Sequence, residues 1–251
     1  MCWQMLMLGL LAESLICTHA ASVAGVLRLP SAPTRLAIDT GASRPVDLHL
    51  DYRAVIASSD ARRVAEWAVT SADNRAMPFI IIDKVNANAF VFDEHGTLLG
   101  TTAILLGLAR GDVSPAGIGN RKLADITREE RITPAGRFVA TIGHDLGVRD
   151  ILWVDYDSAI SLHRVFTGTR SERRLERLAT VTPLDNRISY GCINVPAKFY
   201  DAIVGPTFKA TSGIVYILPE VKSIYEIFGP FGFGHQNADA LQMTPKASQG
   251  K

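Results

Sequence analysis

From Pro78 onward the chain is divided into short apolar or alternating runs, each bounded by glycine, aspartate or asparagine. The runs read PFIIIDKV, AFVFDEHGTLLGTTAILLG, GRFVAT, DILWVDY, AISLHRV and GIVYIL. Runs of this length and composition are typical of β-strands, and Glu94-His95-Gly96 lies where a hairpin turn is expected. Two helical patterns, SERRLERLA and PAKFYDAIV, interrupt them without a regular alternation of strand and helix. The sequence therefore predicts a mainly β fold, a β-sandwich or barrel-like core with helical insertions.

The segments on either side of this core have different textures. An apolar run from Cys2 to Ala12 followed by small residues predicts an export signal over residues 1–21. No lysine or arginine precedes the run and Glu13 ends it, so an N-terminal helix of the fold is the alternative. The run is too short to span a bilayer, and we expect no integral membrane span.

Residues 22–77 are predicted to form an N-terminal arm with one helix. In DARRVAEWAVTSADN the residues Val64, Trp67 and Ala68 have helical spacing, and Asp60 is a plausible N-cap. Residues 78–220 are expected to form the main domain. The glycine- and proline-containing residues 221–251 are expected to be a mobile tail.

The charges of the chain nearly cancel. The sequence has 26 lysines and arginines against 25 aspartates and glutamates. Such a balance gives no electrostatic reason to expect nucleic acid or an anionic membrane as a partner. The histidines and cysteines are not grouped at metal-ligand spacing, so no metal and no cofactor are expected.

Cysteine usage draws attention to one residue. The chain has three cysteines, and removal of the export signal would leave Cys192 alone. A single cysteine in an exported protein cannot form an internal disulfide, which makes a reactive thiol one interpretation and a buried, inert thiol the other. In SYGCIN, Gly191 permits a sharp turn in which the amides of Tyr190, Gly191 and Cys192 converge on one point. The alternative is that Gly191 only makes a tight connection before a helix at Pro196.

A thiol nucleophile needs a base, and His163 is the preferred candidate. In AISLHRV, Ile160 and Leu162 alternate with Ser161 and His163, so the histidine faces away from the apolar side of its strand. His144, in a glycine-flanked turn, is the competitor.

Three separated segments carry a resemblance. ITPAGRF, SLHRV and SYGCINV together resemble the catalytic domain of the L,D-transpeptidases, a family of bacterial peptidoglycan-remodelling enzymes with a β-sandwich fold. The resemblance covers roughly residues 78–220. The residues that match the family motifs are Thr133, Pro134, Gly136, Phe138, His163, Ser189, Gly191, Cys192, Ile193 and Asn194.

The resemblance implies an exported, periplasmic enzyme that acts on peptidoglycan stem peptides without a cofactor and contributes to cell-wall biogenesis. It implies that Cys192 forms an acyl-enzyme, that His163 accepts the thiol proton, and that the amides of Tyr190, Gly191 and Cys192 form the oxyanion hole.

It also implies substrate contacts by Ser189 and Asn194. Arg187, five residues before the cysteine, is expected to bind a substrate carboxylate, because guanidinium binds carboxylate in a bidentate manner.

The chain departs from the family pattern at two places. Tyr190 stands where the family has a histidine, so any role of that imidazole is lost or passes to the phenol. The gap from His163 to Cys192 is 29 positions (192 − 163), longer than usual, and contains the arginine-rich insertion RSERRLERL. The insertion is expected to be a helix with its arginines in solvent and with Leu175 and Leu178 packed inward. The alternative is that one or two of the arginines meet stem-peptide carboxylates.

Two other functions stay open at this point. Water in place of the acceptor amine would make the same site an L,D-carboxypeptidase. A catalytically silent cell-wall-binding module would keep the fold, and Tyr190 is the feature that favours it. The sequence does not identify the acyl acceptor.

Overall fold

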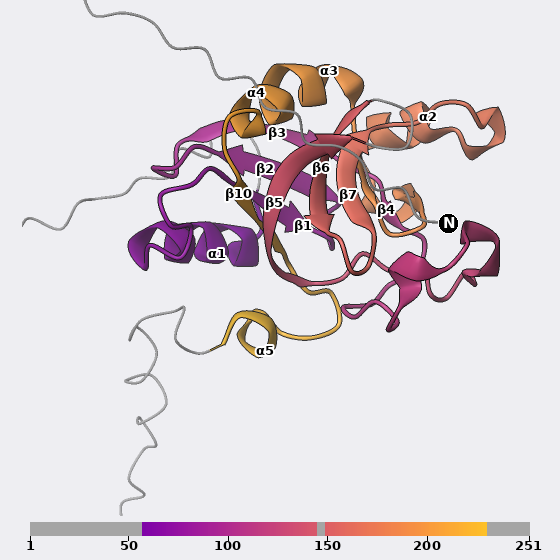
Figure 1. The fold of residues 1–251 in the computed structure, drawn as a ribbon, viewed down its shortest axis with the longest axis horizontal. Helices are drawn as coiled ribbons and strands as arrows, with labels where there is room; N and C mark the ends of the chain where they lie inside the picture. Colours follow the sequence, from indigo (N-terminus) through magenta and orange to yellow (C-terminus); the bar gives the residue numbers. More distant parts are fainter. Residues whose placement is uncertain (1–56, 145–148, 230–251) are drawn as a thin grey trace, which may run out of the picture. The chain divides into compact units, whose positions relative to one another are not determined.

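The structure is a computed structural model that describes residues 57–144 and 149–229 (Figure 1). The predicted export signal, most of the predicted arm and most of the predicted tail lie outside these residues. The strands are β1 (Phe79–Asp83), β2 (Asn88–Phe92), β3 (Leu98–Ala103), β4 (Leu106–Gly107), β5 (Gly136–His144), β6 (Asp150–Asp155), β7 (Ile160–Arg164), β8 (Arg187–Ser189), β9 (Ile193–Val195) and β10 (Gly213–Ile217). The longer helical segments are α1 (Ser59–Thr70), α2 (Arg174–Ala179), α3 (Ala197–Phe199), the π-helix Tyr200–Val204, α4 (Gly205–Phe208) and α5 (Ile224–Phe228); short 3-10 turns are at Ile118–Asn120, Leu123–Asp125, Arg170–Glu172 and Pro183–Asp185.

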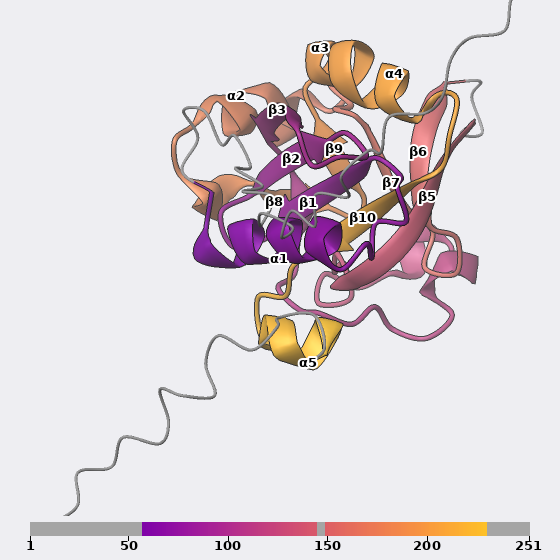
Figure 2. The ribbon, with the colours of Figure 1, turned by 90° about the vertical axis from the view of Figure 1, so that its left-hand side faces the viewer.

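Eight strands form one mixed sheet in the order β3-β2-β1-β10-β5-β6-β7-β9. The long strand β5 divides it into two halves, because residues 136–140 pair with β10 and residues 141–144 pair with β6. In Figure 2, β5 and β6 lie on the right and β1 and β2 lie to their left.

One apolar core lies between the two halves. It contains Ile80 and Val215 from the first half together with Leu152, Leu162 and Val195 from the second. Residues of two inner sheet faces that share a core are the defining feature of a β-sandwich. The prediction of a mainly β fold with helical insertions is confirmed.

The helix predicted in the arm is part of the folded core. Val64, Ala65 and Ala68 of α1 are fully buried in a second apolar cluster, which covers the outer face of β1, β2 and β10. The predicted N-cap is wrong: the Ser58 hydroxyl accepts the Ala61 amide at 3.1 Å, and Asp60 lies in the first turn. A serine two positions earlier thus caps the helix, and the aspartate complements the helix dipole.

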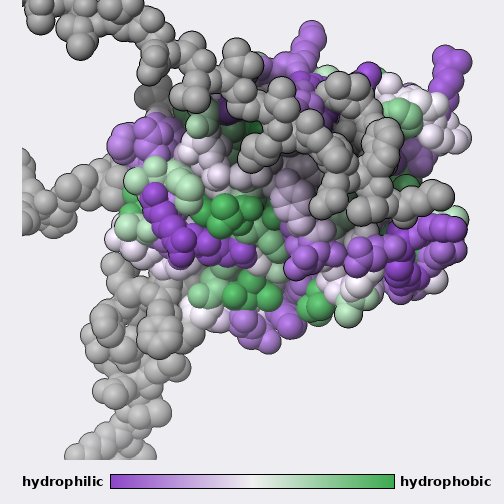
Figure 3. Space-filling model, in the orientation of Figure 1, coloured by the Kyte–Doolittle hydropathy of each residue, from purple (hydrophilic) through white to green (hydrophobic). Residues whose placement is uncertain are grey.

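The beginning of the predicted tail is also ordered. Helix α5 starts with a capping box between Ser223 and Glu226, and Ile224 and Phe228 pack on the second apolar cluster. Across residues 57–144 and 149–229, none of the helices has the length and apolarity needed to cross a membrane. On the face drawn in Figure 3, hydrophobic residues lie in small groups between hydrophilic ones.

A buried ion cluster fixes the chain that follows β10. The Lys84 ammonium donates to Asp112 Oδ1 at 2.8 Å, and both side chains are almost fully buried. Asp112 also accepts the backbone amides of Glu220, Val221 and Lys222 at 2.7–2.9 Å. A buried carboxylate with this many donors stays charged and holds both segments together.

This cluster predicts an acid-dependent stability. Burial alone would raise the pKa of Asp112, but the hydrogen bonds from Lys84 and the three amides lower it to about 2, from an ordinary value of 3.8. Because the folded-state pKa is depressed, the stabilisation is fully present above pH 4 and is lost as the pH falls toward 2. The difference is worth about 2 kcal/mol in the free energy of unfolding.

Denaturant unfolding at neutral pH and at about pH 2.5 measures this contribution. Asp112→Asn should lower the free energy of unfolding at neutral pH and weaken its dependence on pH. Asp125→Asn is the control, because Asp125 is exposed. Equal pH dependence in the wild type and in Asp112→Asn would contradict the assignment.

Candidate active site

Cys192 is the last residue of the three-residue connection between the short strands β8 and β9. The parallel pairing of β7 with β9 sets Leu162 opposite Ile193 and His163 opposite Asn194. This pairing brings Cys192, the residue before β9, beside Ser161, the residue before Leu162. Ser161 Oγ donates to Cys192 Sγ at 3.6 Å.

His163 is the imidazole that contacts the thiol. Its Nδ1 lies 2.7 Å from the Arg164 carbonyl oxygen, and the ring interacts with Cys192 through a side-chain hydrogen bond. A carbonyl oxygen can only accept, so Nδ1 carries the proton in the neutral ring. Nε2 is then the ring nitrogen whose lone pair can accept a proton.

The two groups shift each other's pKa in the directions that ionise both. Burial alone would lower the pKa of His163, but the hydrogen bond and charge of Cys192 raise it above its ordinary value. Burial alone would raise the pKa of Cys192, but His163 and the Ser161 hydroxyl lower it. Ionisation of this kind gives an imidazolium–thiolate pair, the reactive form of a cysteine nucleophile.

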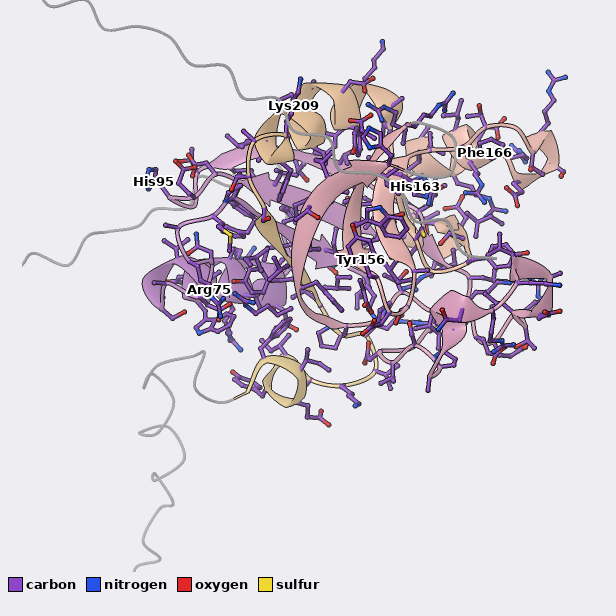
Figure 4. All side chains as sticks on the ribbon, in the orientation of Figure 1. Arg75, His95, Tyr156, His163, Phe166 and Lys209 are labelled. Atoms are coloured by element: carbon purple, nitrogen blue, oxygen red, sulfur yellow. The ribbon has the colours of Figure 1, made fainter. Side chains whose placement is uncertain are left out.

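The pair opens on a cavity of about 720 Å³. Cys192, His163 and Ser161 form the reactive part of its wall, and Ile151, Trp153 and Phe166 contribute apolar surface. His163 and Phe166 are labelled in Figure 4. A cavity of this volume is in the range of pockets that bind small-molecule ligands.

The loop that carries the thiol is held by polar side chains. Gly191 has φ +134°, its amide donates to Ser189 Oγ at 3.1 Å, and its carbonyl accepts the Thr133 hydroxyl at 2.7 Å. Ser189 Oγ donates in turn to the Cys192 carbonyl at 2.6 Å. The predicted use of the Gly191 amide in the oxyanion hole is therefore corrected, because that amide is engaged within the loop. For the amides of Tyr190 and Cys192 this role stays a prediction.

Gly191→Ala should destabilise this loop. An added Cβ would lie 2.7 Å from Ile160 Cδ1 and 2.8 Å from the Ile132 carbonyl oxygen, at a φ that L-residues rarely adopt. We expect a loss of about 1–3 kcal/mol in the free energy of unfolding and slower alkylation of Cys192. Gly117→Ala is the control: φ there is +72°, but nothing lies within 4 Å. A Gly191→Ala protein as stable as this control, with unchanged thiol reactivity, would contradict the prediction.

Two predicted substrate contacts are corrected. Ser189 and Asn194 are 4% and 0% exposed. The Asn194 amide group donates to the Cys192 carbonyl at 3.2 Å, and its Oδ1 accepts from Arg174 at 2.7 Å. Both side chains thus fix the Cys192 backbone from within the protein instead of contacting substrate.

Arg187 does bind a carboxylate, but one of this chain. Its guanidinium donates to Glu220 at 3.0 and 2.6 Å, and the Glu220 side chain is fully buried. The prediction that Arg187 meets a substrate carboxylate is therefore wrong. The pair belongs to the ion cluster of Lys84 and Asp112.

Tyr190 packs on a cation. Its ring centroid lies 3.8 Å from Arg131 Cζ, a cation–π contact that fixes the phenol beside the nucleophile loop. His144, at the end of β5, lines the same cavity as His163. The hydrogen bond to the thiol is made by His163.

The arginine-rich insertion differs from the predicted arrangement at Arg174 and Leu175. Arg173 adopts a left-handed conformation, and α2 begins only at Arg174. Leu175 is 57% exposed, whereas the side chain of Arg174 is only 11% exposed. The expectation that Leu175 packs inward is wrong.

Sequence reasoning missed three residues of this site. Ser161 lies two positions before His163 on the same strand face, so the alternation that selected the histidine could have selected it. Thr133 belongs to the upstream motif, but its contact with the nucleophile loop follows only from the fold. Arg174 had no sequence signal that set it apart from its neighbours. Among the residues that the structure describes, no three acidic, histidine or cysteine side chains could together hold a metal ion.

No protein-family model and no curated protein matches the chain. Among solved structures, the chain is similar to the L,D-transpeptidase LdtMt1 in complex with imipenem, at 14% identity and a TM-score of 0.32, over 56% of this chain and 58% of that one. It is also similar to the catalytic domain of the E. faecium L,D-transpeptidase, at 17% identity and a TM-score of 0.33, over 56% of this chain and 96% of that one. The match thus spans less than two thirds of the first structure. A likeness this distant carries no conclusion about the activity of this chain.

Proposed function

We propose that the protein is an L,D-transpeptidase that acts on peptidoglycan stem peptides through a cysteine acyl-enzyme. The observation that carries the proposal is the hydrogen-bonded Cys192–His163 pair, with both pKa values shifted toward the ionised form, at the wall of a cavity. The substrate class rests on the sequence motifs around Thr133, His163 and Cys192. Export to the periplasm belongs to the same proposal, since stem peptides lie outside the cytoplasm.

In the first half-reaction the Cys192 thiolate attacks the carbonyl carbon of the third residue of a tetrapeptide stem. A C–S bond forms, and the amides of Tyr190 and Cys192 stabilise the negative charge on oxygen. The C–N bond then breaks, and the His163 imidazolium gives its proton to the departing D-alanine nitrogen. The product is a thioester on Cys192 with a neutral imidazole beside it.

In the second half-reaction an amine of another stem attacks the thioester. His163 Nε2 takes a proton from that amine, the C–S bond breaks, and the thiolate is restored. Water in place of the amine gives the carboxypeptidase reaction. A silent wall-binding module is disfavoured, because such a module gains nothing from an ionised thiol.

Incubation of the full chain with purified disaccharide-tetrapeptide muropeptides, read by mass spectrometry, tests the proposal. Cross-linked dimers with loss of one D-alanine are expected. Tripeptide without dimers would identify a carboxypeptidase. Unchanged muropeptides, together with a folded protein, would contradict both activities.

A further inference from the structure

Arg174 is the member of the arginine-rich insertion that turns toward the nucleophile. Its side chain is 11% exposed, against 71% for the neighbouring Arg173. Arg173 has a left-handed conformation, with φ +49°, immediately before α2 begins at Arg174. Burying a guanidinium is costly unless it is paired and hydrogen-bonded, so its contacts reveal its role.

The guanidinium makes two directed contacts. Nε donates to Glu172 at 2.6 Å, and a terminal nitrogen donates to Asn194 Oδ1 at 2.7 Å. The other end of the Asn194 amide donates to the Cys192 carbonyl at 3.2 Å. A continuous line of hydrogen bonds therefore joins the insertion to the peptide of the nucleophile.

The positive charge of Arg174 also acts on the imidazole. The pKa of His163 is raised overall, and Arg174 opposes that rise. Around the imidazole the titratable and charged groups are Cys192 and Arg174 and, lining the same cavity, His144, Arg149, Asp150 and Arg164. Arg164 is ion-paired with Asp150 and Asp201, at 2.9 and 2.6 Å.

We propose that Arg174 is a positioning residue for the Cys192–His163 pair, which orients the Cys192 peptide through Asn194 and, ion-paired with Glu172, holds a positive charge near enough to act on the imidazole. It does not line the cavity and is therefore not assigned a contact with substrate. The effect of Arg174 on acyl transfer rests on the proposed function. An imidazolium that releases its proton more readily is the better acid toward the leaving amine. The insertion, which lengthens the gap between histidine and cysteine, is thus part of the active-site support.

The rate of alkylation of Cys192 by iodoacetamide, measured against pH and assigned by peptide mass mapping, tests the inference. In this step the thiolate forms a C–S bond and iodide leaves, so no peptidoglycan substrate is needed. Arg174→Gln removes the charge, which should raise the pKa of His163 further. Because a nearby cation favours a thiolate, the alkylation profile should also move to higher pH. On its acidic limb the rate should fall about threefold or more.

Two further variants separate charge from geometry. Arg174→Lys keeps the charge but not the two-pronged contact, so its pH profile should stay near that of the wild type while acyl transfer slows. Arg173→Gln removes an exposed charge from the adjacent residue and should change neither. Thermal unfolding of each variant shows whether it is folded.

An unmoved pH profile in folded Arg174→Gln would overturn the inference, and so would an equal shift in Arg173→Gln. If Arg174→Gln does not fold, the Arg174→Lys variant is used instead. Because lysine keeps the charge, its alkylation profile should not move. A shift in Arg174→Lys as large as that expected for loss of the charge would contradict the proposed role. Absence of muropeptide turnover with a shifted profile would refute the proposed function and leave Arg174 as a support of the thiol.

Discussion

Cys192→Ser is expected to abolish muropeptide turnover while the protein stays folded. The serine hydroxyl is far less acidic than the thiol, and the imidazole of His163 is matched to a thiol whose pKa it lowers below the ordinary value. The two contacts of the Cys192 carbonyl, from Ser189 and Asn194, do not involve the side chain and survive the substitution. Product formation by mass spectrometry and the thermal unfolding midpoint are the two measurements.

The contrary outcome is a serine variant with near-normal turnover, which would exclude Cys192 as the nucleophile. Ser161→Ala serves as the matched control on the same cavity. It removes a hydroxyl that hydrogen-bonds the sulfur but leaves the nucleophile in place, so its effect should be much smaller.

His163→Ala should lower the rate about 10²–10⁴-fold, the range for loss of a general acid–base. The structure gives the reason: His163 hydrogen-bonds the thiol, and its Nδ1 is fixed on the Arg164 carbonyl at 2.7 Å. Without the imidazole, Cys192 loses the group that most lowers its pKa. The rate of muropeptide turnover and the rate of thiol alkylation at neutral pH should therefore both fall.

His144→Ala is the control for this variant, because His144 lines the same cavity. Its loss should cost far less than the loss of His163. A larger effect of His144→Ala would reassign the base and leave the cysteine chemistry standing.

The longer strands of the fold could be predicted from the sequence. Alternation and turn residues located β1, β2, β5, β6, β7 and β10, because such strands bury one or both faces in a way that shows in the residue order. The turn at Gly96 was predicted for the same reason, and Gly96 has φ +87° there. The three-residue strands β8 and β9 could not be predicted, because their pairing depends on β4 and β7, far away in the chain.

The candidate pair of Cys192 and His163 could also be predicted from the sequence. Strand alternation and a single cysteine selected them, and the fold brings the two side chains into contact. Their catalytic roles remain predictions. Ser189, Asn194 and Arg187 were misassigned because their partners are buried groups of this chain, and a sequence does not show which polar side chains are satisfied internally.

The prediction for the arginine-rich insertion was wrong for a different reason. Helical spacing placed Leu175 and Leu178 on one side, but the left-handed Arg173 delays the helix by part of a turn. A conformation of this kind in a non-glycine residue is uncommon and is not predictable from the residue type. The side chain of the insertion that is buried against Asn194 is therefore Arg174.

The intact mass of the full chain after incubation with a carbapenem tests the central claim most directly. The Cys192 thiolate should open the β-lactam ring, forming a thioester as the ring C–N bond breaks, so that the protein gains the mass of the whole carbapenem. Peptide mapping should place this single adduct on Cys192 and not on Cys2 or Cys17, and His163→Ala should label much more slowly than His144→Ala. A folded protein that stays unlabelled, or that carries the adduct elsewhere than Cys192, would contradict the account.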